Sequence, residues 1–162
     1  DRKKEGLALR LSILNNMTMV KISEINHLGF IDKKTQRSLA DQYVKEIRVK
    51  TPSVNQLAGN LSGGNQQKVV IAKWLMEDPD ILILDEPTRG IDVGSKAEIY
   101  EIIYEIAKKG AAVIVVSSEL PEILGICDRI ITVAEGKITA EFSGKTATDK
   151  EILAAALGGV PV

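Results

Sequence analysis

The sequence predicts an α/β fold with a mostly parallel sheet, a C-terminal hairpin and a helical subdomain. In residues 61–162, segments with helical periodicity alternate with short apolar runs, which is the pattern of a parallel sheet with crossover helices. Near the end of the chain, Glu135-Gly136 separates two β-rich runs and predicts a hairpin turn. Residues 1–60 are more polar and mainly helical. We therefore expect a helical subdomain with its lead-in over 1–60 and an α/β core over 61–162.

Two helices are expected in the N-terminal part. Ser12 precedes an apolar stretch and can cap a short helix. Between Asp32 and Lys50, apolar residues recur at helical spacing and charged residues fill the other positions, which predicts an amphipathic surface helix. Thr51 and Pro52 then break the pattern. The apolar residues of this helix are Ala40, Tyr43, Val44 and Ile47.

The α/β part begins with a helix over 65–77 that is apolar on most sides, and a continuous apolar run follows at 81–84. Such a run is typical of a strand that is buried on both faces of a parallel sheet. A helix over 95–109 and a strand over 112–117 then complete a βαβ unit. The remaining expected elements are a short helix at 120–125, strands at 130–134 and 137–142, and a helix at 148–157.

The composition is that of an ordinary globular domain. The chain has 162 residues, of which 44% are hydrophobic, and its 21 basic and 22 acidic side chains give a net charge of −1. This balance offers no overall attraction for nucleic acid, so we expect no nucleic-acid partner. The single cysteine, Cys127, cannot form an intrachain disulfide, and a reducing compartment is expected. The first residues are charged and include no initiating Met, which indicates a piece of a longer protein.

Two adjacent carboxylates, Asp85 and Glu86, end the apolar run at 81–84. Ligands of open parallel sheets bind beyond the carboxyl ends of the strands, where these side chains are expected. Asp85 can hold Mg²⁺, which favours carboxylate and phosphate oxygens together. Glu86 can orient a water for attack on a phosphate. An equally weighted alternative is that both residues form only a polar turn after the strand.

The second candidate site is the glycine-rich turn of Leu61 to Lys68, LSGGNQQK. Ser62 stands at the N-cap position of the following helix, and Gly63 and Gly64 let the backbone approach a ligand closely. The free N–H groups and positive dipole end of such a helix favour a phosphate. The alternative is a turn that only caps a core helix.

Together and in this order, the two motifs resemble the ATP-binding cassette of ABC ATPases. The segment Leu61 to Gln67 is similar to the signature motif, and Ile81 to Glu86 is similar to Walker B with its catalytic glutamate. Asp92 falls in the D-loop, and Ser118 stands at the position of the switch histidine. The runs LSGGNQQK, DEPTRGIDVG and SSELPEIL resemble the second cassette of the tandem ATPases that energise bacterial monosaccharide importers of the ribose, galactose and xylose type.

This resemblance implies a P-loop NTPase-like cassette that uses ATP and Mg²⁺ and couples hydrolysis to monosaccharide uptake. It implies a partner ABC cassette, membrane permease subunits in contact with residues 7–60, and a peripheral location on the cytoplasmic face of the inner membrane. Asp85 and Glu86 are then catalytic, Asp85 being the metal ligand, and Ser118 is a degenerate switch residue. The implied nucleotide-binding residues are Ser62, Gly63, Gly64, Asn65, Gln66 and Asp92.

The sequence departs from the family pattern in three ways. It has no Gly-x-x-x-x-Gly-Lys-[Ser/Thr] phosphate loop, so we expect the isolated chain to hydrolyse no ATP. The strand that leads into that loop is then missing between the strands at 112–117 and 130–134, which predicts a rearranged sheet or self-association of the chain. Asn65 replaces the commoner glutamine of the signature, and Ser118 cannot protonate as histidine does.

Three alternatives stay open. A soluble tandem-cassette ATPase of the translation-factor type shares both motifs, but would normally keep the switch histidine. A DNA-repair or chromosome-organising ATPase also shares them, but its cassette halves are joined by heptad arms, and the sequence has no heptads. A non-catalytic interaction module is favoured by Ser118 and by the missing phosphate loop.

Overall fold

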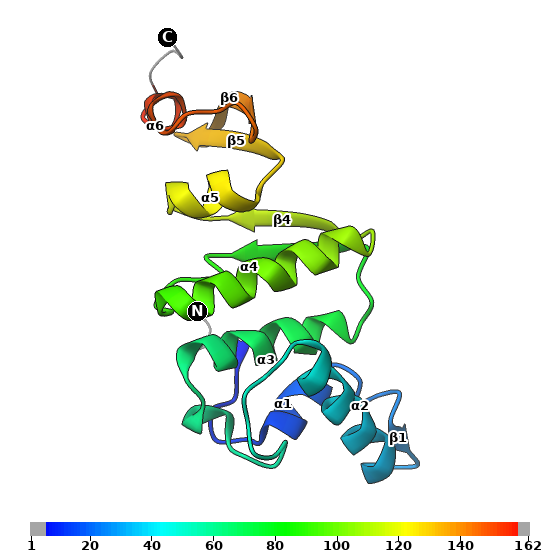
Figure 1. The fold of residues 1–162 in the computed structure, drawn as a ribbon. Coiled ribbons are helices and arrows are strands. Elements are labelled where there is room, and N and C mark those ends of the chain that lie inside the picture. The colour runs from blue at the N-terminus through cyan, green and yellow to red at the C-terminus, as the bar shows by residue number, and fades with distance from the viewer. Residues whose placement is uncertain (1–5, 159–162) are drawn as a thin grey trace. The chain divides into compact units, whose positions relative to one another are not determined.

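The structure is a computed structural model that describes residues 6–158. The chain forms two compact units. Unit 1 comprises residues 1–82 and 88–113, and unit 2 comprises residues 83–87 and 114–162. Figure 1 shows the order of the elements along the chain. The elements of unit 1 are α1 (Ile13–Thr18), β1 (Asn26–His27), β2 (Phe30–Ile31), α2 (Lys33–Glu46), the 3₁₀-helix η2 (Ala58–Asn60), α3 (Gly63–Leu75) and α4 (Val93–Lys108). Unit 2 holds α5 (Leu120–Ile126), β5 (Arg129–Ala134), β6 (Lys137–Ser143) and α6 (Asp149–Ala156), while β3 (Ile81–Asp85) and β4 (Ala112–Val116) run through both units.

The core of unit 1 lies where α1 and α2 pack against α3. Ile13 and Met17 of α1 and Val69 and Ala72 of α3 are completely buried in it. Ser12 caps α1 as predicted, because its side chain accepts a hydrogen bond from the N–H of Asn15. The helix α3 is thereby fixed along its apolar side, with the glycine-rich turn at its N-terminus.

The amphipathic helix α2 is shorter than predicted. It begins after Asp32, whose carboxylate accepts hydrogen bonds from the N–H groups of Lys34 and Thr35, but it ends at Glu46 instead of Lys50. The reason is that Arg48 adopts a left-handed conformation, with φ of 54°, which no α-helix can contain. The segment that follows leaves the helix axis and carries Lys50 toward α3.

The hairpin of β1 and β2 was not predicted from the sequence. Asn26 pairs with Ile31 and His27 with Phe30 in antiparallel register. The two residues between the strands, Leu28 and Gly29, both have positive φ, which defines the tight hairpin turn that twists with its strands. A leucine is an unusual residue at such a position, which is why the turn lacks a clear sequence signal.

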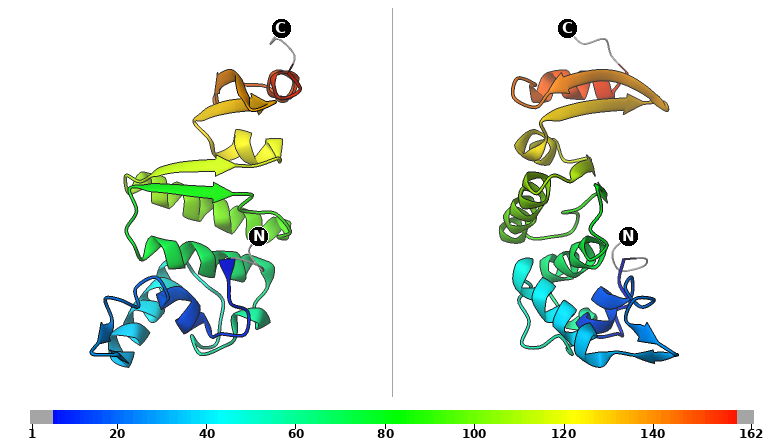
Figure 2. Two further views of the ribbon diagram at one scale, coloured as in Figure 1. Left: turned by 180° about the vertical axis from the view of Figure 1, so that it is seen from behind. Right: turned by 90° about the vertical axis from the view of Figure 1, so that its right-hand side faces the viewer.

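The strands β3 and β4 are neighbours in a two-stranded sheet and run in the same direction (Figure 2). At their beginnings the N–H of Ala112 donates to the carbonyl of Asp80, and at their ends the N–H of Glu86 donates to the carbonyl of Val116. The parallel βαβ unit is therefore as predicted. The expected burial of both faces is wrong: Leu82 and Leu84 are buried, whereas the alternate residues of β3 are more than half exposed, because no described element covers that face.

The C-terminal hairpin agrees with the prediction. Strands β5 and β6 pair in antiparallel fashion from Arg129 with Ser143 to Ala134 with Lys137. Both turn residues, Glu135 and Gly136, have positive φ as that turn type requires. Among the described strands, β4 does not pair with β5, so the sheet has not rearranged to close the expected gap.

Candidate functional site

The glycine-rich turn of unit 1 presents the hydroxyl of Ser62 at the start of α3. Ser62 is exposed and has the extended backbone of an N-cap residue, with φ of −60° and ψ of 159°. Its hydroxyl nevertheless caps none of the N–H groups in the described helix. The N-terminus of α3 therefore keeps backbone donors and the positive end of its dipole available for an anion.

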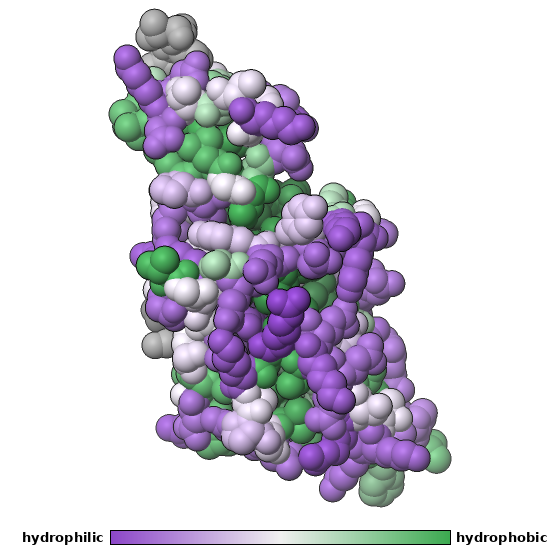
Figure 3. Space-filling model, viewed as in Figure 1, coloured by the Kyte–Doolittle hydropathy of each residue, from purple (hydrophilic) through white to green (hydrophobic). Residues whose placement is uncertain are grey.

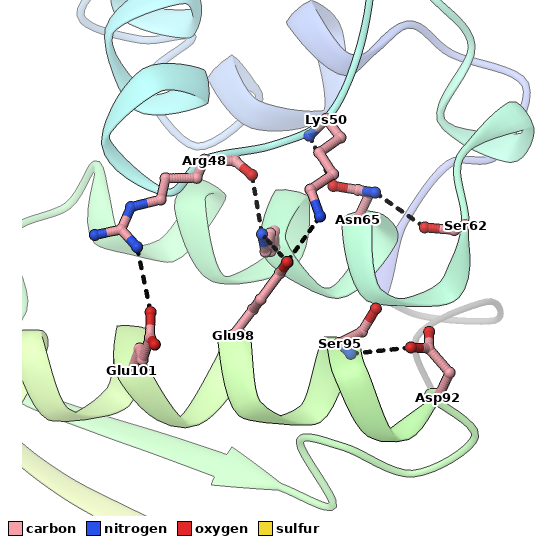
Figure 4. Close-up of polar contacts among 9 residues, drawn as sticks. Arg48, Lys50, Ser62, Asn65, Asp92, Ser95, Glu98 and Glu101 are labelled. Carbon is pink, nitrogen blue, oxygen red and sulfur yellow. Dashed lines mark hydrogen bonds and ion pairs between the residues drawn. The ribbon is translucent and has the colours of Figure 1, made fainter.

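Asn65 fixes this hydroxyl from the first turn of the same helix (Figure 4). The side-chain nitrogen Nδ2 of Asn65 lies 2.9 Å from Oγ of Ser62, and its Oδ1 accepts the backbone N–H of Lys50 at 2.7 Å. One half-buried side chain thus joins the turn to the segment that follows α2.

Gly64 is buried where α3 approaches α4. A Cβ atom on Gly64 would lie 2.5 Å from Cβ of Ser95, closer than such atoms are found in proteins. The glycine is thus required for close helix packing, whatever ligand the turn binds.

Gln66 points into unit 1 and not toward the exposed turn. Its side chain is buried, and its Nε2 donates a hydrogen bond of 3.2 Å to the carbonyl of Ala58 in η2. Its predicted contact with nucleotide stays a prediction, and the observed position indicates support of the turn from beneath.

Asp92 belongs to the same unit as the glycine-rich turn. It is exposed and caps α4, since Oδ1 accepts the N–H of Ser95 at 2.9 Å. Hydrogen bonds from the backbone and side chain of Ser95 hold the pKa of Asp92 below its usual value. Ser95, which packs against Gly64, therefore also orients the carboxylate of Asp92.

An ion-pair network in unit 1 was not predicted. Glu98 of α4 accepts a 2.7 Å hydrogen bond from Nζ of Lys50 and another from Nζ of Lys68, which is 2% exposed (Figure 4). The two ammonium groups, Lys50 first, lower the pKa of Glu98 to about 2. No sequence pattern could have indicated this network, because its members lie in three separate segments.

A cavity of about 520 Å³ lies beside this network in unit 1. Figure 3 shows hydrophilic residues crowded over α3 and α4 on this face. Each of the four cations that line the cavity forms an ion pair with a glutamate, two of them with Glu98, and four glutamates in the lining balance their charge. We therefore do not place a phosphate group there. These cations are Arg48, Lys50, Lys68 and Lys109.

The carboxylates of Asp85 and Glu86 lie in unit 2, at the carboxyl end of β3. Asp85 is exposed, and a single free carboxylate fits Mg²⁺, which is held in proteins by one or two carboxylates together with phosphates and water. Glu86 has a left-handed backbone with φ of 46°, a conformation that costs a non-glycine residue about 1–3 kcal/mol.

Ser118 contacts Glu86 through its backbone and not through its hydroxyl. The N–H of Ser118 donates to Oε1 of Glu86 at 3.0 Å. The structure thus brings together the predicted catalytic glutamate and the predicted switch position within unit 2. The predicted site residues fall into two groups, one in each unit.

This fold is that of ATP-binding cassettes. A solved structure of an ATP-binding cassette from an ABC transporter has a TM-score of 0.79 at 21% identity, with 98% of this chain and 67% of that chain covered. The dimeric structure of a bacterial ABC transporter cassette has a TM-score of 0.71 at 26% identity, with 85% and 58% covered. The predicted α/β cassette fold is confirmed.

The family model for ABC transporters matches residues 3–89, which is more than half of the 162-residue chain. The chain belongs to the ABC transporter family. The family resemblance seen in the sequence is therefore confirmed.

Import proteins are among the curated proteins that the chain is similar to. The ribose import ATP-binding protein of Clostridium tetani is 51% identical over 154 residues, with 94% of this chain and 30% of that protein covered. The xylose import ATP-binding protein of Geobacillus kaustophilus is 48% identical over 159 residues, with 98% and 32% covered. The chain thus spans about a third of the length of these relatives. Among the described residues, no helix is both long and apolar enough to cross a membrane.

Proposed function

We propose that this chain is part of the ATP-binding subunit of a monosaccharide importer, in which ATP binding and hydrolysis drive sugar uptake. Membership of the ABC transporter family and near 50% identity to ribose and xylose import proteins support this proposal. The observation that carries the nucleotide-binding part of the proposal is the exposed Ser62 hydroxyl at the uncapped N-terminus of α3, which suits a phosphate group.

The turn in unit 1 acts on a nucleotide that a partner cassette holds. The hydroxyl of Ser62 and the first N–H groups of α3 donate hydrogen bonds to phosphate oxygens of that nucleotide. Gly63 and Gly64 keep the turn free of side chains, and Gln66 and Asn65 support it from within. Asp92 faces the same interface, because it belongs to the adjoining end of α4. The existence of dimeric cassette structures supports this arrangement.

The carboxylates of unit 2 act on the nucleotide of their own cassette. Bound Mg²⁺ supplies positive charge that stabilises the phosphates during transfer. Asp85 holds that ion, and Glu86 accepts a hydrogen bond from the attacking water and orients it. The N–H of Ser118 restricts the carboxylate of Glu86 to one orientation, a task that does not need a protonated side chain.

The two parts expected from the sequence have different roles in this proposal. Residues 7–60 contact the membrane permease, and residues 61–162 carry the nucleotide chemistry. We therefore propose that the subunit lies peripherally at the cytoplasmic face of the inner membrane. Retention of the permease, and not of ribosomes, in a pull-down with the complete subunit separates this function from that of a translation factor.

The role of Ser62 is tested in the complete subunit by nucleotide trapping in each cassette. Ser62→Arg should reduce trapping at the partner's site more than at its own site, because the turn acts across the interface. Thr146→Arg is the matched control, since it places the same charge at an exposed position outside both groups of predicted site residues. Equal loss at both sites would contradict the assignment. The 162-residue chain alone should hydrolyse no ATP, because it offers no phosphate loop.

A further inference from the structure

The side chain of Asn65 has only one possible orientation in this structure. A backbone N–H can only donate, so the atom of Asn65 that faces the N–H of Lys50 at 2.7 Å must be the amide oxygen. The NH₂ group then faces Ser62 and donates to its Oγ at 2.9 Å (Figure 4). The polarity of the contact between Asn65 and Ser62 is therefore fixed by Lys50.

This polarity determines which hydrogen bond the Ser62 hydroxyl can still form. A hydroxyl has one hydrogen and two lone pairs, and Asn65 occupies a lone pair. The hydrogen of Ser62 cannot point at the amino group, and the residue is exposed. Since the described residues offer this hydrogen no acceptor, the Ser62 hydroxyl can donate it to a bound ligand or to solvent.

The N-terminus of α6 offers an internal comparison with the opposite polarity. There Thr148 is the N-cap residue, and Glu151 occupies the position that Asn65 has in α3. The hydroxyl of Thr148 donates its hydrogen to Oε2 of Glu151 at 2.6 Å, within a complete capping box. An acceptor at this position takes the hydroxyl hydrogen in a hydrogen bond within the helix terminus. An amide donor leaves the hydroxyl hydrogen available for a different acceptor.

The segment that holds Asn65 is itself anchored. Nζ of Lys50 donates to Oε1 of Glu98, and Nζ of Lys68 donates both to Oε2 of Glu98 and to the carbonyl of Arg48 at 2.9 Å. These bonds tie the backbone around Lys50 to α3 and α4. The N–H that orients Asn65 is thus held in place from two helices.

We propose that Asn65 is a positioning residue that holds Ser62 as a hydrogen-bond donor toward a phosphate oxygen of the nucleotide in the partner cassette. The inference rests on the proposed function and deepens it, because it assigns the polarity of the Ser62 contact. Asn65 itself needs no contact with the nucleotide. The atom that accepts the hydrogen bond from Ser62 is an anionic oxygen of that phosphate.

Asn65→Asp tests this polarity with a side chain of the same shape. The carboxylate can still accept the N–H of Lys50, but it also accepts the hydrogen of Ser62, as Glu151 does from Thr148 in α6. In the complete subunit assembled with its partners, we expect kcat/KM for ATP to fall about tenfold or more, since a hydrogen bond to a charged group is lost. Thr146→Asp is the control for charge: Thr146 is exposed and lies outside both groups of predicted site residues, and we expect a change below about twofold.

The Ser62→Ala background separates positioning from a structural effect. If Asn65 acts through Ser62, Asn65→Asp should change kcat/KM by less than about twofold in a subunit that already carries Ser62→Ala. A full additional loss there, or an equal loss for Thr146→Asp, would overturn the inference and leave the proposed function intact. Wild-type turnover of the Ser62→Ala subunit would overturn the assignment of Ser62 itself, and the inference with it.

Folding is checked separately by thermal melting of the 162-residue chain. Asn65→Asp should melt within about 3 °C of the unaltered chain, which corresponds to no more than about 1 kcal/mol for a domain of this size. If it melts lower, Asn65→Gln and Asn65→Leu provide the same comparison without charge. The glutamine variant keeps an amide donor and should retain more turnover than the leucine variant, whereas equal turnover of the two would contradict the inference.

Discussion

At the scale of single residues, Gly64 shows how a motif residue can be required by packing. Gly64→Ala would place a Cβ 2.5 Å from Cβ of Ser95, and either helix must move to relieve the overlap. We expect this substitution to lower the free energy of unfolding of the chain by about 1–3 kcal/mol. Urea unfolding followed by circular dichroism measures the change.

Gly94→Ala is the matched control for Gly64→Ala. A Cβ on Gly94 meets its nearest neighbour, Oδ1 of Asp92, at 3.5 Å, which is an ordinary contact. We expect a change within about 0.5 kcal/mol. Adding Ser95→Gly to Gly64→Ala should recover part of the lost stability, and no recovery would show that the cost has another origin.

Glu98 gives unit 1 a defined dependence on acid. Its pKa in the folded chain is about 2, below its usual value of 4.5, because Lys50 and Lys68 donate hydrogen bonds to its carboxylate. A lowered folded-state pKa stabilises the protein above pH 4.5, and this stabilisation is lost as the pH falls toward 2. Glu98→Gln should therefore destabilise the chain by about 1–2 kcal/mol at pH 7 and by progressively less below pH 4.5.

The control for Glu98→Gln is Glu101→Gln. Glu101 pairs with Arg48 at 3.2 Å, but both side chains are more than 60% exposed. We expect a change within about 0.5 kcal/mol at any pH, since exposed pairs contribute little. A stability difference between Glu98→Gln and the unaltered chain that stays constant from pH 7 to pH 2 would contradict the assigned pKa.

At the scale of elements, the beginning of α4 depends on Asp92. Its carboxylate accepts the N–H of Ser95 and supplies negative charge at the positive end of the helix dipole. Asp92→Ala should cost about 1 kcal/mol of unfolding free energy, whereas Asp92→Ser should cost only a few tenths because serine also caps. Equal losses for the two variants in urea unfolding would show that the cap does not determine where α4 begins.

At the scale of the whole molecule, the strands of unit 2 leave apolar surface uncovered. Ile114 and Val116 of β4 and Ile131 and Val133 of β5 are 45–60% exposed, and each strand has one unpaired edge among the described residues. Natural proteins avoid such edges because they pair with other chains. We therefore predict that the 162-residue chain self-associates by strand pairing.

Light scattering and amide exchange test this prediction. The scattering mass should rise with concentration, and the amides of residues 114–116 should exchange more slowly as it does. Val133→Lys places a charge beside the edge and should shift the chain toward monomer. A monodisperse monomer whose β4 and β5 amides exchange rapidly, yet which melts cooperatively, would contradict the prediction.

The sequence by itself determined the features that depend on residues close together in the chain. Ser12 signals the start of α1, Glu135-Gly136 signals the hairpin turn, and the run before Asp85 signals the strand β3. It also placed both candidate sites, because their motifs are contiguous: a helix N-terminus needs only Ser62 and the glycines that follow it.

Only the tertiary structure decided what those residues touch. The N–H of Lys50 that orients Asn65 comes from a segment that the sequence assigned to a helix, and the left-handed Arg48 turns it away. Glu98 lies on α4, beyond a strand and a loop, and its bond to buried Lys68 follows no sequence period. The physical reason is that periodicity and capping act over one helical turn or one hairpin, whereas the hydrogen bonds that fix the polarity of the Ser62 hydroxyl join segments that only folding brings together.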